Sequence, residues 1–469
     1  MVSARSTGHR QALNEEVMLP GFEMGRNSVE REGSENEPER SGFNDPAFAG
    51  NKALPVHRWV PWIAGFSSDF VSGALSRYLV NQGTVLDPFS GVGTTLVEAI
   101  NHGHNAIGFE INPYAALACR VKTTASSINV KSLTNSIARF HEFCKSKINN
   151  GYQPRSMQPE GFKTRDEFYS PKVLHKVLVV YDFLDTVAEE NLRSLFDLAF
   201  AATMVRYSNY SYEPSLGRRV SAGKQQIEDF AVAASVEAKL WEMCEDIAWL
   251  QAHMPQNNQQ ARVINDTFFN SEQHVAQGSI DLVITSPPYL NNYHYNRNTR
   301  PQLYWLGYAQ KPKDFQALEE ANFGKFWQTV RERESLELEF DLAGSDLSER
   351  INVLRSLNTE KGIYGGHGWA NYAAAYFNDC RRCALGIKHV LRSGGTALVV
   401  IGNSILQGVL MPTDQYFGRI AESVGLELVG IEIPRAARVG NSIIQSNVRV
   451  GKAKDKQHLY EAVVELKKR

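Results

Sequence analysis

The sequence predicts an α/β protein built on a doubly wound, mostly parallel sheet of the Rossmann-like kind. Short apolar runs of strand length recur along the chain, at residues 83–86, 105–109, 262–264, 280–284, 396–401 and 426–433. Helical periodicity follows the first of these runs, over residues 95–101. Apolar strands that alternate with helices are typical of a parallel sheet covered by helices on both faces.

We expect four regions along the chain. Residues 1–45 are polar and densely charged, which predicts a disordered or loosely held arm. Residues 126–259 show helical periodicity and predict a helical insertion between the second and third strands. Residues 311–370, rich in charge and glycine, predict a second insertion. The sheet-bearing domain would then consist of residues 46–125, 260–310 and 371–469.

The amino-acid composition limits the classes of protein to which this chain could belong. No apolar run approaches the roughly 20 residues needed to cross a bilayer, so we expect a soluble, cytoplasmic protein that does not bind membranes. The five cysteines form no metal-like or disulfide-like array, which predicts packed thiols and no metal site. The formal net charge of −1 means that any nucleic-acid contact must come from local basic surfaces.

A glycine-rich turn follows the first predicted strand, where Asp87 leads into Gly91 and Gly93. Sheets of this kind bind ligands at such a position, and Glu110 at the end of the second strand could accept hydrogen bonds from ribose hydroxyls. Leu96 replaces the third glycine of the dinucleotide fingerprint, which argues against NAD or FAD, and no Gly-Lys-Ser/Thr motif supports an ATP loop. S-adenosyl-L-methionine fits this pattern better, with a dehydrogenase left open as an alternative.

The run at residues 279–285 ends abruptly in Ser286, Pro287, Pro288 and Tyr289. Two prolines lack N–H groups, so their carbonyls form a rigid corner beside a hydroxyl and an aromatic ring. Such a corner suits a planar group that carries an amine, for example a base turned out of a nucleic-acid stack. At the end of the third strand, Asp266 could accept the adenine amino group of the cofactor or cap a helix.

Together these motifs resemble those of the amino-methylating DNA methyltransferases, and the Ser-Pro-Pro-Tyr form is similar to the cytosine-N4 branch. The resemblance covers residues 55–120, 260–310 and 385–435, about half of the chain. It implies S-adenosyl-L-methionine as the cofactor and makes the sheet-bearing domain a methyltransferase catalytic domain. The cofactor-binding residues that it implies are Phe66, Ser67, Asp87, Phe89, Gly91, Gly93, Thr94, Glu110, Ile111, Asp266 and Thr267.

The resemblance also implies that Ser286, Pro287, Pro288 and Tyr289 are catalytic. We expect the Ser286 hydroxyl and the Pro287 carbonyl to accept the two amine hydrogens, while Tyr289 stacks on the extruded base. No Pro-Cys dipeptide occurs in the chain, which excludes carbon-5 cytosine methylation and the zinc deaminase signature. Adenine N6, an RNA base, and a catalytically silent nucleic-acid-binding protein remain alternatives.

Double-stranded DNA is the expected partner, with two clusters of aromatic and basic residues as candidate contacts. One cluster follows the proline corner and consists of Tyr293, Tyr295, Arg297 and Arg300. The other lies in the helical insertion, the candidate target recognition region, and consists of Arg206, Arg218, Arg219 and Lys224. The sequence leaves open whether residues 126–259 or 311–370 read the target, whether a cognate restriction endonuclease exists, and the oligomeric state.

Overall fold

The computed structural model describes residues 42–62, 65, 67–212, 215–254, 259–290, 295–325, 327–436 and 459–469. Residues Ser41–Arg469 form one compact unit. The predicted arm at residues 1–45 lies outside the described residues except for its last four positions, where Phe43 is buried against Phe70. In the described part of the chain, no helix combines the length and apolarity that crossing a membrane requires.

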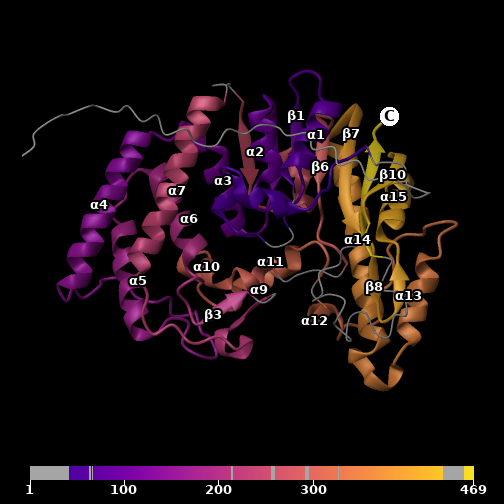
Figure 1. The fold of residues 1–469 in the computed structure, drawn as a ribbon. Helices are drawn as coiled ribbons and strands as arrows, with labels where there is room; N and C mark the ends of the chain where they lie inside the picture. Colours follow the sequence, from indigo (N-terminus) through magenta and orange to yellow (C-terminus); the bar gives the residue numbers. More distant parts are fainter. Residues whose placement is uncertain are drawn as a thin grey trace, which may run out of the picture. The chain divides into compact units, whose positions relative to one another are not determined.

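A seven-stranded sheet lies at the centre of this unit (Figure 1). Its strands follow the spatial order β10 (Glu427–Ala436), β11 (Tyr460–Lys467), β7 (Leu391–Gly402), β6 (Ile280–Thr285), β1 (Thr84–Asp87), β2 (Asn105–Phe109) and β5 (Ala261–Ile264). The run from β7 to β5 is parallel throughout. The predicted doubly wound, mostly parallel sheet is therefore confirmed.

Helices cover both faces of the sheet because adjacent strand residues point to opposite sides. Val85 of β1 packs in a cluster with helices α1 (Ser68–Tyr78) and α2 (Thr94–Asn101). Leu86, the next residue, packs in a different cluster with α14 (Gly366–Val390) and α15 (Thr413–Ser423). Helix α3 (Pro113–Thr123) follows β2 and contacts both α2 and β5. Because β1, β2 and β6 run parallel, their carboxyl ends lie at the same edge of the sheet, where they can form a site.

Strand β11 is the element of the sheet that the sequence patterns did not predict. It runs antiparallel to both neighbours, with Ala462 opposite Ile401 and Val464 opposite Val399 of β7. Its apolar run is short and bordered by Glu461 and Glu465, which hides it from a search for long apolar segments. The fully buried side chains of Ala462, Val463, Val464 and Leu466 show that it is nevertheless a core strand, which lies between β7 and β10.

The region between β2 and β5 is mostly helical, with α4 (Val130–Asn149), α5 (Pro171–Leu184), α6 (Glu190–Thr203) and α7 (Val232–His253) packed together (Figure 1). It also contains a hairpin, β3 (Tyr210–Tyr212) and β4 (Leu216–Arg218), which periodicity did not predict. Asp246 of α7 fixes these helices to the segment before α1, because it accepts hydrogen bonds from Arg58, the Val56 amide and the Trp59 indole. Its carboxylate is 2% exposed, so this attachment is a buried one.

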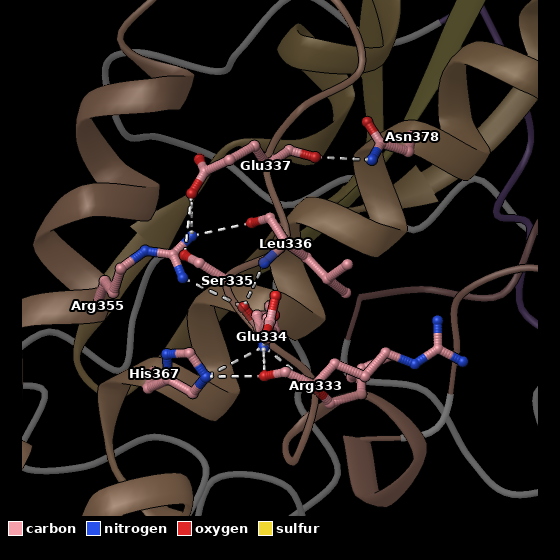
Figure 2. Close-up of polar contacts among 10 residues, drawn as sticks. Arg333, Glu334, Ser335, Leu336, Glu337, Arg355, His367 and Asn378 are labelled. Atoms are coloured by element: carbon pink, nitrogen blue, oxygen red, sulfur yellow. Dashed lines mark hydrogen bonds and ion pairs between the residues drawn. The ribbon is translucent and has the colours of Figure 1, made fainter.

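Between β6 and β7 the chain forms α9 (Tyr295–Asn298), α10 (Arg300–Trp305), α11 (Asp314–Ala321), α12 (Trp327–Val330) and α13 (Leu347–Ser356). Figure 2 shows how residues 333–337, which form no helix or strand, are held. Arg355 of α13 donates to the Leu336 carbonyl at 2.9 Å, and His367 and Asn378 of α14 donate to the Arg333 and Glu337 carbonyls at 3.0 Å each. These side chains replace the missing regular hydrogen bonds and pin the segment to α14.

Candidate active site

Asp87 joins the glycine turn to the strand that carries the proline corner. Its carboxylate is 2% exposed and accepts hydrogen bonds from Thr95 Oγ1 and Thr285 Oγ1, both at 2.7 Å, and from the Phe89 amide at 3.0 Å. Burial raises the pKa of Asp87 to about 6, although these three donors oppose the rise. Thr285 directly precedes Ser286, so the Asp87 carboxylate links the glycine turn to the proline corner and sets the distance between them.

The turn itself requires glycine at two positions. Gly91 and Gly93 have φ angles of +51° and +89°, in the left-handed region that side chains disfavour. A Cβ on Gly93 would also lie 2.7 Å from Cys119 Sγ. Leu96, at the third fingerprint position, is accommodated by a glycine elsewhere: a Cβ on Gly108 of β2 would lie 2.8 Å from Leu96 Cδ1. Helix α2 can therefore pack closely on the sheet because β2 has a glycine at position 108, and the helix itself needs no glycine at position 96.

Glu110 lies directly after β2 with both carboxylate oxygens oriented by backbone donors. The Gly91 amide donates to Oε2 at 2.9 Å, and the Asn112 amide donates to Oε1 at 2.7 Å. Burial raises the pKa of Glu110 to about 7, an effect that the backbone donors reduce and the charge of Asp87 increases. Each oxygen retains a lone pair, so the group can still accept hydrogen bonds from a ligand.

One cavity collects residues from both motifs. It is lined by Trp62, Pro88, Phe89, Gly91, Phe109, Glu110, Ile111, Asn112, Thr267, Phe268, Ser286, Pro288, Tyr295, Asn296, Asn322 and Phe323. The glycine turn, the carboxylate after β2, and Ser286 and Pro288 of the corner thus face the same space, whereas Pro287 and Tyr289 do not line it. This arrangement can hold a methyl donor beside an acceptor group.

Several residues that the sequence assigned to the cofactor are placed around this cavity without lining it. Asp87, Gly93 and Thr94 belong to the turn or flank it but do not line the cavity. Ser67 caps α1 by accepting a hydrogen bond from the Phe70 amide at 3.4 Å. Phe66 and Tyr293 lie outside the described residues. Trp62, four residues before Phe66, lines the cavity, and the sequence patterns did not single it out as a site residue.

Asp266 also stands back from the lining, whereas its neighbours Thr267 and Phe268 contribute to it. Its carboxylate accepts hydrogen bonds from His274 at 2.8 Å and from Asn270 at 3.1 Å. Burial alone would raise the pKa of Asp266, but these donors and the Thr267 amide leave it below its ordinary value. In this structure Asp266 organises the turn after β5.

The proline corner is held from two sides by residues distant in sequence. Tyr376 of α14, fully buried, donates to the Pro288 carbonyl at 3.1 Å. Tyr289 donates from its hydroxyl to Glu461 of β11 at 3.1 Å, and a Cβ on Gly402 would lie 3.1 Å from its ring. Burial and the charge of Glu461 raise the pKa of Tyr289 well above its ordinary value, so the hydroxyl stays protonated. No local sequence signal identifies Tyr376 or Glu461.

The two segments that carry the aromatic and basic clusters contact each other at Asn298 of α9. Its side-chain oxygen accepts from the Leu216 amide of β4, and its carbonyl accepts from the Tyr212 hydroxyl of β3, each at 3.0 Å. The hairpin of the helical region therefore touches the helix that follows the proline corner. On α9 itself, Tyr295 stacks on Trp62 with ring centroids 5.8 Å apart.

The basic side chains of these clusters differ in their surroundings. Arg206, Arg297 and Lys224 are exposed, whereas Arg218 pairs with Asp166 at 3.0 Å. Two further members are held within the protein: Arg219 donates to the Gln225 carbonyl at 2.8 Å, and Arg300 lies 5.6 Å from the Tyr304 ring centroid.

Metal-binding groups do not gather in the part of the chain that the structure describes: no cluster of three or more His, Cys, Asp or Glu side chains could hold an ion there. All five cysteines are buried as free thiols, including Cys380 and Cys383 on α14. Burial raises the pKa of both thiols, so neither is a reactive thiolate.

The raised pKa of Glu110 predicts a pH dependence for nucleoside binding. A carboxylate accepts hydroxyl hydrogens better than a carboxylic acid does, so protonation below about pH 7 should weaken binding by up to tenfold per pH unit. Titration calorimetry of S-adenosylhomocysteine between about pH 5.5 and pH 8.5 measures this, since the ligand itself changes charge little in that range. The Glu110→Gln variant should bind more weakly with a flat profile, and a parent protein whose affinity is independent of pH would contradict the assignment.

Comparisons with known proteins agree with this geometry. The family model described as DNA methylase, of the N6- and N4-methylating type, matches residues 66–119. The chain is 25% identical over 438 residues to the Type II methyltransferase M.BsoBI of Geobacillus stearothermophilus, covering 84% of this chain and 83% of the relative. It is 23% identical over 420 residues to the Type II methyltransferase M.AvaI of Anabaena variabilis, covering 84% of each.

A third relative, the Type II methyltransferase M.MvaI of Kocuria varians, is 24% identical over 229 residues, or 47% of this chain and 50% of the relative. The matched family segment contains the glycine turn and Glu110, and the longer matches extend the similarity over most of the chain. The chain is therefore similar to the Type II methyltransferases over most of its length and to the amino-methylating DNA methylases over residues 66–119, a likeness that implies S-adenosyl-L-methionine as the methyl donor.

Proposed function

We propose that this protein transfers the methyl group of S-adenosyl-L-methionine to the N4 amine of cytosine within a specific sequence of double-stranded DNA. The observation that carries the proposal is that Ser286 and Pro288 line the same cavity as Gly91 and Glu110. Cytosine is favoured because serine stands at the first position of the corner, the form that resembles the cytosine-N4 branch. Adenine N6 is the nearest alternative acceptor.

The residues of the corner act on the acceptor amine. The lone pair of a cytosine amine is delocalised into the ring, so the nitrogen is a weak nucleophile. In the proposed complex Ser286 Oγ and the Pro287 carbonyl accept the two N–H hydrogens, which favours a tetrahedral nitrogen with its lone pair directed at the methyl group. Tyr289 stacks on the extruded ring, and its bond to Glu461 fixes the orientation of its own ring.

The bound cofactor supplies an electrophilic methyl group on a sulfonium. The amine nitrogen, held by Ser286 and Pro287, would take this methyl group, and the electron pair of the broken carbon–sulfur bond would stay with the departing thioether. The amine then releases one proton to solvent. No covalent enzyme intermediate is needed, which agrees with the buried, protonated state of the cysteines.

The cofactor-binding role of the cavity follows from its donor and acceptor groups. Glu110 would accept from the ribose hydroxyls, Ile111 and Phe268 would contact the adenine, and Phe89 and Gly91 would contact the methionine end. The Trp62 and Tyr295 rings form one wall beside the turn. Ser67, Asp87, Gly93, Thr94 and Asp266 would position these groups rather than contact the ligand.

Target recognition is assigned in this proposal to the helical region of residues 126–259. The support is the contact at Asn298, which joins the hairpin β3–β4 to the helix after the proline corner. Exposed Arg206, Lys224 and Arg297 would contact phosphates on either side of the extruded base. Because its relatives are Type II methyltransferases, we extend the proposal to protection of the target sequence against a cognate restriction endonuclease.

Product identification tests the proposed function. The protein is incubated with unmethylated plasmid DNA and methyl-deuterated S-adenosyl-L-methionine, and the DNA is digested to nucleosides and analysed by mass spectrometry. Labelled N4-methyl-2′-deoxycytidine is expected. Labelled N6-methyl-2′-deoxyadenosine would show that adenine, the alternative acceptor, is the target. Labelled 5-methyl-2′-deoxycytidine, or binding of cofactor and DNA with no product, would overturn the proposal.

A further inference from the structure

Asn296 is a wall residue of the cavity that neither the sequence motifs nor the proposed mechanism uses. It lies on α9, is 4% exposed, and shares the lining with Glu110 and Ser286. Buried amides usually satisfy both their oxygen and their nitrogen within the protein.

Its neighbour Asn112 fixes which end of the Asn296 amide is oxygen. Asn112 Oδ1 caps α3 by accepting from the Tyr114 and Ala115 amides at 3.1 and 3.3 Å, so the other end of that side chain must be its nitrogen. Asn112 Nδ2 donates to Thr299 Oγ1 at 2.7 Å and to Asn296 Oδ1 at 3.3 Å. The oxygen of Asn296 is thus directed to Asn112, which leaves Nδ2 at the opposite end.

Asn296 Nδ2 is buried and has no hydrogen-bond acceptor among the residues that the structure describes. An amide donor left in this state carries an unfavourable desolvation free energy of about 1 to 3 kcal/mol. A ligand that offers an acceptor oxygen in the cavity would relieve it. The unmatched donor therefore indicates a contact that forms only when the cavity is filled.

Asn112 also orients Glu110, whose carboxylate is an acceptor on the same cavity as the Asn296 donor. Its backbone amide donates to Glu110 Oε1 at 2.7 Å, while its side chain donates to Asn296 Oδ1. One residue thereby sets the positions of a carboxylate that accepts and an amide that donates on the same cavity. A vicinal diol matches this pair, because each hydroxyl can donate one hydrogen and accept another.

We propose that Asn296 is a cofactor-binding residue that donates from Nδ2 to a ribose hydroxyl oxygen of S-adenosyl-L-methionine, while Glu110 accepts the hydroxyl hydrogens. This inference rests on the ribose-binding role proposed for Glu110. It adds a donor from the segment after the proline corner to a site otherwise built by the first two strands. The ribose then bridges the end of β2 and α9.

Calorimetric binding of S-adenosylhomocysteine, and of its analogue lacking both ribose hydroxyls, tests the proposal. Asn296→Ala should weaken binding of S-adenosylhomocysteine about tenfold, the effect of one buried hydrogen bond, and should change binding of the analogue less than twofold. Asn298→Ala is the matched control, because Asn298 is equally buried on the same helix but accepts from Leu216. It should lower the melting temperature without changing either dissociation constant.

Asn296→Asp, which keeps the oxygen that Asn112 binds and loses the donor, replaces the alanine variant if that variant does not fold. Equal losses for both ligands, or no loss for either, would overturn the role of Asn296. Glu110→Ala separates this failure from failure of the underlying assignment. If Glu110→Ala binds S-adenosylhomocysteine as tightly as the parent, the ribose site itself is wrong, whereas a weakened Glu110→Ala with an unaffected Asn296→Ala rejects Asn296 alone.

Discussion

Ser286→Ala is expected to lower the rate of methyl transfer about a hundredfold while the dissociation constant for S-adenosylhomocysteine stays within twofold of the parent. The reason is that the proposed hydroxyl contact acts on the amine as it becomes tetrahedral, and loss of one preorganised polar contact of this kind typically costs that factor in turnover. The cofactor side of the cavity, formed by Phe89, Gly91 and Glu110, is left intact. Single-turnover kinetics with enzyme and cofactor in excess over DNA measures the chemical step separately from binding.

The companion variant is Ser404→Ala, which removes a fully buried hydroxyl from β8 (Ser404–Leu406) outside the cavity. It should leave the single-turnover rate within a factor of two. If Ser286→Ala transfers methyl groups as fast as the parent, Ser286 does not contact the acceptor amine. A loss confined to cofactor affinity would instead place Ser286 in the nucleoside site.

Gly93→Ala is expected to reduce the free energy of unfolding by roughly 2 to 5 kcal/mol and to abolish measurable cofactor binding. Two effects add: a side chain at a φ of +89° is strained, and its Cβ would lie 2.7 Å from Cys119 Sγ and 3.1 Å from the Cys119 Cα. Relief of this overlap would shift the turn that presents Gly91 to the cavity. Urea denaturation and calorimetric titration measure the two consequences.

Gly408→Ala separates the two contributions. Gly408 has a similar φ of +85°, but no atom lies within 4 Å of the position of its Cβ, so only the conformational term of about 1 to 2 kcal/mol should appear. Cys119→Ala combined with Gly93→Ala should recover part of the lost stability by removing the sulfur atom. Equal stabilities of Gly93→Ala and Gly408→Ala would show that crowding against α3 is not what requires glycine here.

The parts of the site that the sequence predicts are those in which a short segment determines its own conformation. Gly91 and Gly93 mark a turn because few other residues adopt positive φ, and the two prolines after Ser286 enforce a corner regardless of what surrounds them. The central strands β1, β6 and β7 are similarly evident, because their apolar residues at 85–86, 282–284 and 397–401 are buried. In these cases the residue types and their place relative to the predicted strands are enough to predict the local structure.

The parts that it does not predict depend on partners far along the chain. Tyr376 reaches Pro288 across 88 positions, and Tyr289 reaches Glu461 across 172. Strand β11 is recognisable as a strand only once β7 and β10 are in place on either side of it. Asp266 illustrates an intermediate case: the end of β5 was predicted correctly, but its carboxylate binds His274 and Asn270 of the following turn.

A crystal structure of the protein with S-adenosylhomocysteine bound tests the central claim most directly. We predict that the ribose lies against Glu110, the amino acid portion lies against Phe89 and Gly91, and the thioether sulfur faces the opening between Ser286 and Pro288. A ligand bound elsewhere on the molecule, or one whose sulfur is directed away from the proline corner, would contradict methyl transfer at this cavity.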